Sequence, residues 1–428
     1  MTTRDLNTEI CTQVQQIHRS AWRGSIEDVA SGGLLSAWLQ REAGASDTLW
    51  QALCSYAREA QLQRYGDLSD RAVSAAAVQH WAAHNLQTDP HFFSLALSGV
   101  LRSGAQSSGD QHAWLALQLS DGRSWCLHLR CLAETRADQQ AALARLALNL
   151  LWQLATSDDL LVAALPQALQ AQLEIDVWQA LHLPVFEQLK QSLALFAAGW
   201  TPLLLFQPDA QGGLLPQRYL DTLRDRHLLV HKGAFNPVTR AHLAMVDTVH
   251  AQLHEALPLL EISPGNLDKA EASHDNLAHR LQMLAWQPWP LAVSRWGALY
   301  QMREGLVQRG CARQVDFICG EDLYARVFVP RYYTDLPGGA DEGLTRLFDG
   351  QTRLWVCQRP HTPLPVDAAA EALRQRWAAQ CQLLPFDWPM ASSAVRAAIA
   401  SGVADGSAQL QPEVAAYIQE QGLYQAEA

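Results

Sequence analysis

Apolar and polar positions follow different patterns along the chain and divide it into three zones. The first zone, up to about Ala155, is rich in Ala and Leu, and the second, up to about Arg226, carries apolar stripes at helical spacing. The last zone alternates short apolar runs with helical stretches. We therefore predict a first domain over residues 1–157, a helical connecting region over 158–226 and a second domain over 227–428.

The first zone predicts a hairpin followed by a helix. Residues 113–120 and 125–130 are two apolar runs with Asp121-Gly122 between them, a dipeptide typical of tight turns between strands. Residues 137–154 then carry apolar side chains at the spacing of an amphipathic helix. Together these elements indicate an α/β layer.

The middle zone predicts mainly helices. The stretches 160–173 and 177–198 are rich in Leu and Ala, and we expect their apolar stripes to be packing surfaces. The run 202–206, followed by the glycine-containing stretch 211–213, predicts a strand and a turn. We assign no chemical role to this zone.

The last zone predicts a parallel, doubly wound sheet of the Rossmann-like type. Buried-strand runs occur at 227–231, 315–319 and 352–357, and a polar loop follows each of them. Strands that alternate with helices form parallel sheets, and such sheets bind ligands at the carboxyl ends of their strands. We therefore assign the chain to the α/β class with two α/β domains, and the three loops are candidate ligand-binding positions.

Composition narrows the classes of function. The chain has 428 residues, enough for two cores, and its 49% hydrophobic and 18% charged residues are the balance of a globular enzyme. A net charge of −11 argues against a general nucleic-acid binder. The N-terminus offers no apolar signal region, no long apolar span follows, and the eight cysteines are scattered without metal-ligand spacing. We expect a cytoplasmic protein that binds neither nucleic acid nor membrane and builds no metal site from its own side chains.

The loop after the run 227–231 carries the candidate chemistry. Gly233 lets the backbone approach a phosphate group closely, and Pro237 precedes a helix whose amino end offers N–H groups to an anion. Thr239 and His242 are three residues apart, so in a first helical turn both side chains can face the same bound group. This loop is therefore a candidate phosphate-binding site.

Two stretches resemble the signatures of the HxGH nucleotidyltransferase superfamily. Gly233-Ala-Phe-Asn-Pro-Val-Thr-Arg-Ala-His242 is similar to the first signature and Met390-Ala-Ser-Ser-Ala-Val-Arg396 to the second, in the expected order. Thr239 stands where many members have His, Ala241 replaces a Gly and Ala391 replaces a Ser. The side chain of Ala241 reduces the space in which the backbone can approach a phosphate. Ala391 lacks the hydroxyl donor of the Ser that it replaces.

The resemblance implies transfer of a nucleotidyl group from a triphosphate to a phosphorylated small molecule, with release of pyrophosphate. It implies that His242 and Thr239 contact the triphosphate and that Asn236 orients a phosphate oxygen. The residues it assigns are His242, Thr239 and Arg396 for catalysis, and Gly233, Ala234, Phe235, Asn236, Ser392 and Ser393 for nucleotide binding. Mg²⁺ would accompany ATP and would be held mainly by the phosphates.

A looser resemblance concerns the acceptor. Residues 262–269 and 280–284 are similar to stretches of nicotinamide and nicotinate mononucleotide adenylyltransferases, and Gly320-Glu-Asp322 resembles their G-x-D loop. This implies ATP and a pyridine mononucleotide as substrates. The substrate-binding candidates are Lys269, Asp322 and Arg359. A position on the surface or in a helix cap would explain these charged residues equally well. A cytidylyltransferase that acts on another phosphate ester is the alternative.

The first domain resembles the CinA-type nicotinamide-nucleotide amidohydrolase domain over about residues 10–155. Asp28-Val-Ala-Ser-Gly-Gly-Leu-Leu35 and Tyr56-Ala-Arg-Glu-Ala-Gln61 are similar to two of its motifs in order and spacing. Val29 takes the place of the nucleophilic Ser and Gln61 that of a Lys, so the acyl-transfer mechanism loses both groups. We expect this domain to be catalytically inactive and to serve in sensing or in forming a homo-oligomer. If both domains have lost their chemistry, the chain is instead a non-catalytic, nucleotide-binding regulatory protein.

Overall fold

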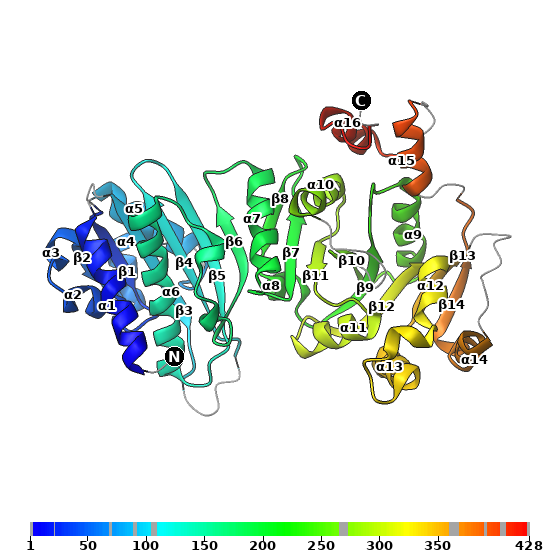
Figure 1. The fold of residues 1–428 in the computed structure, drawn as a ribbon, viewed down its shortest axis with the longest axis horizontal. Coiled ribbons are helices and arrows are strands. Elements are labelled where there is room, and N and C mark those ends of the chain that lie inside the picture. The colour runs from blue at the N-terminus through cyan, green and yellow to red at the C-terminus, as the bar shows by residue number, and fades with distance from the viewer. Residues whose placement is uncertain are drawn as a thin grey trace. The chain divides into compact units, whose positions relative to one another are not determined.

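A computed structural model describes most of the chain. The described residues are 3–20, 22–67, 71–88, 92–103, 109–264, 273–358, 368–388, 392–402 and 408–425. The chain divides into two compact units, unit 1 (residues 1–201) and unit 2 (residues 202–428). Each unit contains one mixed β-sheet with helices packed on it (Figure 1). The predicted α/β class with two α/β domains is therefore confirmed.

Unit 1 contains a six-stranded sheet in the order β2-β1-β3-β4-β5-β6. Its strands are β1 Gly24–Asp28, β2 Leu49–Leu53, β3 Phe93–Val100, β4 His112–Leu119, β5 Ser124–Cys131 and β6 Leu173–Ala180. β1 pairs in parallel with β2 and β3, whereas the pairs from β3 to β6 are antiparallel. The predicted hairpin is confirmed, because β4 and β5 are joined through Gly122, whose φ of 94° costs a glycine little.

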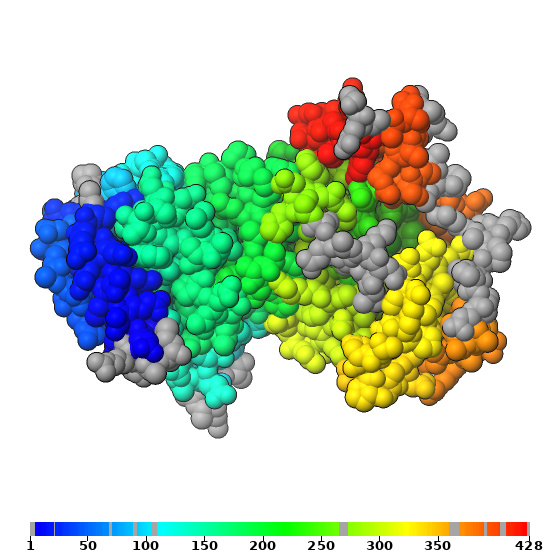
Figure 2. Space-filling view, viewed as in Figure 1, coloured from blue at the N-terminus to red at the C-terminus, as the bar shows by residue number. Residues whose placement is uncertain are grey.

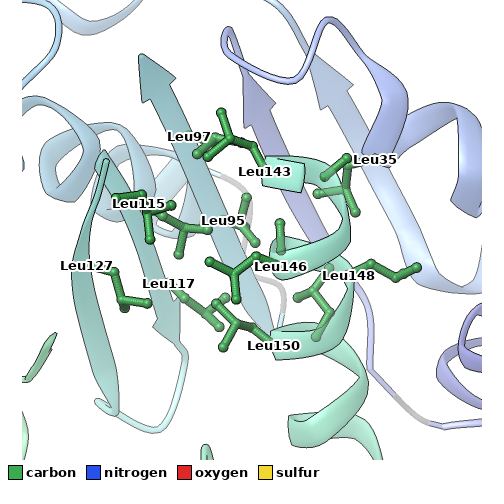
Figure 3. Close-up of a cluster of buried hydrophobic side chains, with 14 of the residues drawn as sticks. Leu35, Leu95, Leu97, Leu115, Leu117, Leu127, Leu143, Leu146, Leu148 and Leu150 are labelled. Carbon is green, nitrogen blue, oxygen red and sulfur yellow. The ribbon is translucent and has the colours of Figure 1, made fainter. Parts of the chain in front are cut away.

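Helices cover both faces of this sheet. They are α1 Thr3–Arg19, α2 Leu34–Arg41, α3 Ala45–Thr48, α4 Arg58–Tyr65, α5 Ala75–Thr88, α6 Arg136–Ser157 and α7 Val185–Ala197. Figure 3 shows Leu146 and Leu150 of α6 pointing toward the leucines of the sheet, among them Leu95 and Leu117. The opposite face packs against α5. Helix α6 confirms the helix predicted over residues 137–154.

The middle zone differs from the helical connecting region that its pattern predicted. The two units meet in sequence between Thr201 and Pro202, so this zone is divided between them. The stretch 160–173, predicted to be helical, forms two short 3-10 turns, Val162–Ala164 and Gln167–Leu169, before β6 begins. β6 completes the sheet of unit 1, while the strand predicted at 202–206 is confirmed as the beginning of β7 in unit 2.

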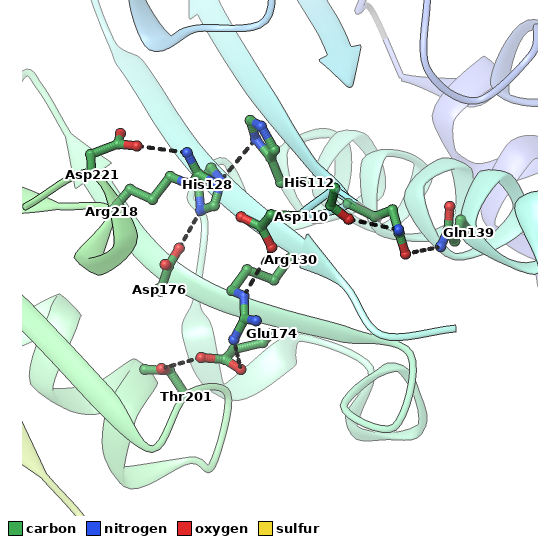
Figure 4. A network of polar contacts seen from close by, with 12 residues as sticks. Asp110, His112, His128, Arg130, Gln139, Glu174, Asp176, Thr201, Arg218 and Asp221 are labelled. Atoms are coloured by element: carbon green, nitrogen blue, oxygen red, sulfur yellow. Dashed lines mark hydrogen bonds and ion pairs between the residues drawn. The ribbon is translucent and has the colours of Figure 1, made fainter. Parts of the chain in front are cut away.

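Strand β6 carries acidic residues that are nevertheless buried. Asp176 is paired with His128 of β5, and a guanidinium nitrogen of Arg130 lies 3.2 Å from a carboxylate oxygen of Glu174 (Figure 4). Nε2 of His128 lies 3.1 Å from Nδ1 of His112 on β4. Neighbouring strands therefore supply the partners that buried charges require.

Unit 2 contains an eight-stranded sheet in the order β14-β13-β12-β9-β10-β11-β7-β8. Its strands are β7 Leu203–Pro208, β8 Leu214–Gln217, β9 Arg226–Gly233, β10 Leu257–Ile262, β11 Leu291–Ser294, β12 Ala312–Gly320, β13 Leu354–Gln358 and β14 Cys381–Pro385. The strands from β14 to β11 are parallel, and β7 and β8 add an antiparallel edge. The predicted Rossmann-like, doubly wound sheet is confirmed, with β9, β12 and β13 at the three predicted runs.

The helices of unit 2 lie on both faces of its sheet. They are α8 Tyr219–Leu223, α9 Arg240–His250, α10 His274–Leu284, α11 Leu299–Gln308, α12 Glu321–Val327, α13 Gly339–Phe348, α14 Ala368–Arg376, α15 Ser392–Ala400 and α16 Pro412–Glu420. Leu228 and Val230 of β9 share a core with α11 and α13. Because side chains alternate along a strand, His231 faces the other side, where its ring approaches His242 of α9. Within the described stretches, we find no helix with the length and apolar character needed to cross a membrane.

Candidate nucleotide-binding site

The candidate site begins where β9 ends, in the loop of residues 234–239. β9 has β10 on one side and β12 on the other, so the winding of the sheet reverses here, and such a switch point is where doubly wound sheets bind ligands. A Cβ added to Gly233 would lie 2.8 Å from the ring of Phe235, so the loop needs glycine there. Phe235 is only 1% exposed, and its ring supports the loop from inside, whereas Ala234 is exposed.

Thr239 and His242 form the amino-terminal cap of α9. Thr239 is the N-cap, and its backbone N–H donates to Nδ1 of His242 at 3.1 Å, while its hydroxyl oxygen lies 2.8 Å from the same nitrogen. A ring nitrogen that accepts from a backbone N–H carries no proton, so neutral His242 holds its proton on Nε2. The cap therefore makes His242 an Nε2–H donor. Thr239 is 2% exposed and faces His242, so it positions that residue.

The two signature-like stretches meet in space. Ser392, the first residue of α15, donates its hydroxyl to the carbonyl oxygen of Pro237 at 2.9 Å, and Arg396 donates to the carbonyl oxygen of Asn236. Oδ1 of Asn236 also accepts a hydrogen bond from the hydroxyl of Tyr424. The loop after β9 and the start of α15 thus form one cluster, although Pro237 and Ser392 are 155 residues apart in the chain.

The structure describes one of the three residues predicted to bind the acceptor substrate, Asp322. Asp322 is exposed in the first turn of α12, directly after β12. Because β12 is the parallel neighbour of β9, Asp322 lies at the same edge of the sheet as Gly233, the last residue of β9. Ser393 is exposed in the first turn of α15. Lys269 and Arg359 lie outside the described stretches, as do Met390 and Ala391 of the second signature-like stretch.

A buried histidine that the sequence did not single out lies behind His242. The ring centroid of His231 is 5.9 Å from that of His242 and 5.3 Å from that of Phe235. Its Nδ1 lies 3.4 Å from the carbonyl oxygen of Ile318 on β12, and its Nε2 has no hydrogen-bond partner among the described residues. Burial lowers the pKa of the His231 imidazole from 6.5 to about 4. His231 is therefore neutral near pH 7.

This lowered pKa predicts a pH-dependent loss of stability. As the pH falls, the unfolded chain takes up a proton at His231 near pH 6.5 but the folded chain only near pH 4, so stability is lost within that window. Between pH 7.5 and pH 5 we expect a loss of about 2 kcal/mol from this residue. His231→Leu removes this contribution, so denaturant titrations of both proteins at the two pH values should show a smaller pH dependence for the variant. An equal pH dependence in both would contradict the assignment.

Lys232 belongs to a buried ionic network that the sequence analysis also missed. Its Nζ donates to the carboxylate of Glu261 at 2.8 Å and to the carbonyl oxygen of Trp296 at 2.9 Å, and it contacts the hydroxyl of Ser263. Glu261 is fully buried and accepts a further hydrogen bond from Ser294 at 2.7 Å. These contacts use the three donors of an ammonium group. Lys232 therefore ties the loops after β10 and β11 to the end of β9.

The residues of unit 1 that carry the amidohydrolase resemblance lie near the end of β1. Val29 is partly buried against the core beneath α5, and Nε2 of Gln61 in α4 donates to the carbonyl oxygen of Ser55 at 2.8 Å. The hydroxyl of Ser31 is bonded to the carboxylate of Asp28. An isopropyl group and an amide therefore occupy the two positions that the resemblance gives to a nucleophile and a base.

Some solved structures are similar to parts of this chain. No protein-family model and no curated protein matches the chain. Solved structures that resemble it include a competence/damage inducible protein, CihA, from Agrobacterium tumefaciens, at 21% identity and a TM-score of 0.31, covering 33% of this chain and 92% of that one. They also include a Plasmodium falciparum nicotinic acid mononucleotide adenylyltransferase complexed with NaAD, at 16% identity and a TM-score of 0.33, covering 46% and 97%. Each of these similarities covers less than half of this chain.

The donor set around the loop bears on how a metal ion could bind. Within the part of the chain that the structure describes, no three His, Cys, Asp or Glu side chains are grouped so that they could hold a metal ion. Mg²⁺ that accompanies a nucleotide takes many of its ligands from phosphate oxygens and water. The described residues therefore fit an ion carried by the nucleotide, with the protein contacting the phosphates.

Proposed function

We propose that unit 2 is a nucleotidyltransferase that transfers AMP from ATP to a pyridine mononucleotide and releases pyrophosphate. The observation that carries this proposal is the cluster of the loop after β9 with the start of α15, in which Ser392 and Arg396 contact the carbonyl groups of Pro237 and Asn236. One polyphosphate chain can reach the amino end of α9, the imidazole of His242 and the guanidinium of Arg396 only if these groups are close together. Their convergence at a switch point of the sheet supports a shared ligand.

The proposed reaction is a displacement at the α-phosphorus of ATP. A phosphate oxygen of the mononucleotide forms the new P–O bond, the bond between the α-phosphorus and the bridging oxygen breaks, and that oxygen leaves with the electron pair as part of pyrophosphate. Such a transfer depends on positioning and on neutralising charge. His242 would donate its Nε2–H to a phosphate oxygen, and Arg396 would neutralise the leaving group. Mg²⁺, carried by the phosphates, supplies further charge neutralisation when bound.

Adenylyl transfer to a pyridine mononucleotide is favoured over cytidylyl transfer to another phosphate ester. The support comes from the resemblance of residues 262–269, 280–284 and 320–322 to the pyridine-mononucleotide adenylyltransferases. Asp322, whose exposed carboxylate follows β12 at the same sheet edge as the loop, can accept hydrogen bonds from ribose hydroxyl groups. ATP and CTP both carry these hydroxyl groups, so Asp322 supports nucleotide binding and does not select the base.

A turnover experiment on the full chain tests this function. We expect pyrophosphate release from ATP and Mg²⁺ with nicotinamide or nicotinate mononucleotide, together with a dinucleotide identified by its mass. Parallel reactions contain CTP with phosphate esters. Faster turnover with CTP would transfer the assignment to a cytidylyltransferase. If ATP binds and no pair of substrates reacts, the chain is a nucleotide-binding regulatory protein.

For unit 1 we propose a non-catalytic role. Val29 offers no nucleophile, and the Gln61 amide is engaged with the backbone of Ser55. An amide cannot take the proton that a serine nucleophile would lose. Sensing of a pyridine nucleotide or formation of a homo-oligomer are the roles that remain for this unit.

A further inference from the structure

A second arginine, Arg280 of α10, contacts the same loop as Arg396. Nη1 of Arg280 lies 3.5 Å from the carbonyl oxygen of Ala234, at the outer limit of a hydrogen bond, and Arg396 donates to the carbonyl oxygen of Asn236. The two acceptors are two residues apart in the chain. Two guanidinium groups from different helices therefore approach one short piece of backbone.

Neither guanidinium has an acidic partner in the described stretches. The ion pairs found there involve neither Arg280 nor Arg396, and Nε of Arg280 is buried without a hydrogen-bond partner. A buried N–H without a partner is costly, because it has given up water without gaining an acceptor. An anion that bound here would supply the acceptor.

The electrostatics of the cluster agree with a missing negative charge. Burial lowers the pKa of Arg280, the positive charge of Arg396 lowers it further, and Tyr424 acts in the opposite direction. Burial raises the pKa of the Tyr424 hydroxyl to about 12, and both arginines oppose this rise. Tyr424 thus lies within electrostatic reach of both arginines. It follows α16 in the chain, and α16, in red, lies against the yellow-green α10 in Figure 2. The cluster holds two positive charges and a neutral phenol.

We propose that Arg280 and Arg396 together bind the polyphosphate of the nucleoside triphosphate, and that Arg280 keeps hold of the pyrophosphate as it leaves. The inference rests on the proposed function of unit 2 and adds a binding residue to it. Pyrophosphate offers several charged oxygens, so it can accept hydrogen bonds from both guanidinium groups at once. Arg280 could instead bind the single phosphate group of the mononucleotide. The experiment below distinguishes this alternative from pyrophosphate binding.

Binding of inorganic pyrophosphate to the full chain, measured by calorimetry with Mg²⁺ present, tests the proposal. We expect Arg280→Gln to weaken pyrophosphate and ATP binding about tenfold or more, because a charge-assisted hydrogen bond is lost. Arg280→Lys keeps the charge but not the planar guanidinium group, so its affinity for pyrophosphate should lie between those of Arg280→Gln and the wild type. Binding of nicotinate mononucleotide should not change.

Arg346→Gln is the matched control. Arg346 lies on α13, on the opposite face of the sheet, and pairs with Glu342 at 2.6 Å, so its loss should leave pyrophosphate binding unchanged. If Arg280→Gln binds pyrophosphate like the wild type, or weakens only mononucleotide binding, Arg280 is not a polyphosphate ligand, although the transferase assignment stands. If the wild type neither binds pyrophosphate nor turns over, the transferase assignment itself fails. Should Arg280→Gln unfold, Arg280→Lys decides the question.

Discussion

Replacing His242 by alanine should lower the turnover of the proposed transfer by about 10²- to 10³-fold, the usual effect of removing one preorganised donor from a developing charge. The cap of α9 sets this expectation, because Thr239 N–H donates to Nδ1 of His242 at 3.1 Å and so leaves the proton on Nε2. The variant loses that Nε2–H donor. Its turnover should be measured with the best substrate pair under saturating conditions, beside a denaturant titration.

A second substitution separates the chemical role of His242 from its role in the cap. His242→Ala leaves the N–H of Thr239 without its acceptor, which should cost about 1 kcal/mol of unfolding free energy. Glutamine at this helix position can accept the same N–H, so His242→Gln should keep the stability and still lose most of the turnover. If stability and turnover fall together in the alanine variant and both recover in the glutamine variant, His242 is a structural residue.

The sequence predicted the parts of the fold that follow from local patterns. The hairpin through Gly122 needed only a turn dipeptide between two apolar runs, and β9, β12 and β13 needed only short apolar runs before polar loops. Parallel strands bring their carboxyl ends to one edge, so the loop after β9 could be identified as a candidate site without coordinates.

Strand β6 shows where a local pattern was available and was overlooked. The segment Leu173-Glu-Ile-Asp-Val177 alternates apolar and acidic residues as a half-exposed strand does, but it follows a Leu-rich stretch that predicted a helix. Glu174 and Asp176 are buried all the same, because β5 provides Arg130 and His128 as partners. Only the pairing of β5 with β6 reveals this, and pairing is not a local property.

The contacts inside the candidate site could not be predicted from the sequence for a similar reason. Lys232 and Glu261 are 29 residues apart in the chain and meet because β9 and β10 pair with these two residues in register. His231 sits in an apolar run, so its pattern predicted a buried strand and gave no sign of the neighbouring His242 ring. Thr239 was expected to face a ligand, but the helix cap turns its hydroxyl toward His242.

Replacing Lys232 by methionine should produce a large loss of stability in unit 2. The variant leaves the carboxylate of Glu261 fully buried with only hydroxyl donors, from Ser263 and Ser294. Removing one partner of a buried ion pair costs about 3 to 5 kcal/mol, because the other charge stays in a medium that solvates it poorly. Denaturant titration of the variant beside the wild type measures this difference in unfolding free energy.

The double variant Lys232→Met with Glu261→Leu tests the physical cause. With both charges gone, apolar side chains of similar volume fill the space, and such replacements of buried ion pairs are often neutral or stabilising. The double variant should therefore regain most of the lost stability, while its turnover stays low because the loops after β10 and β11 are no longer tied to β9. A single variant that keeps its stability but loses turnover would refute this structural role, since Lys232 would then be acting on the ligand.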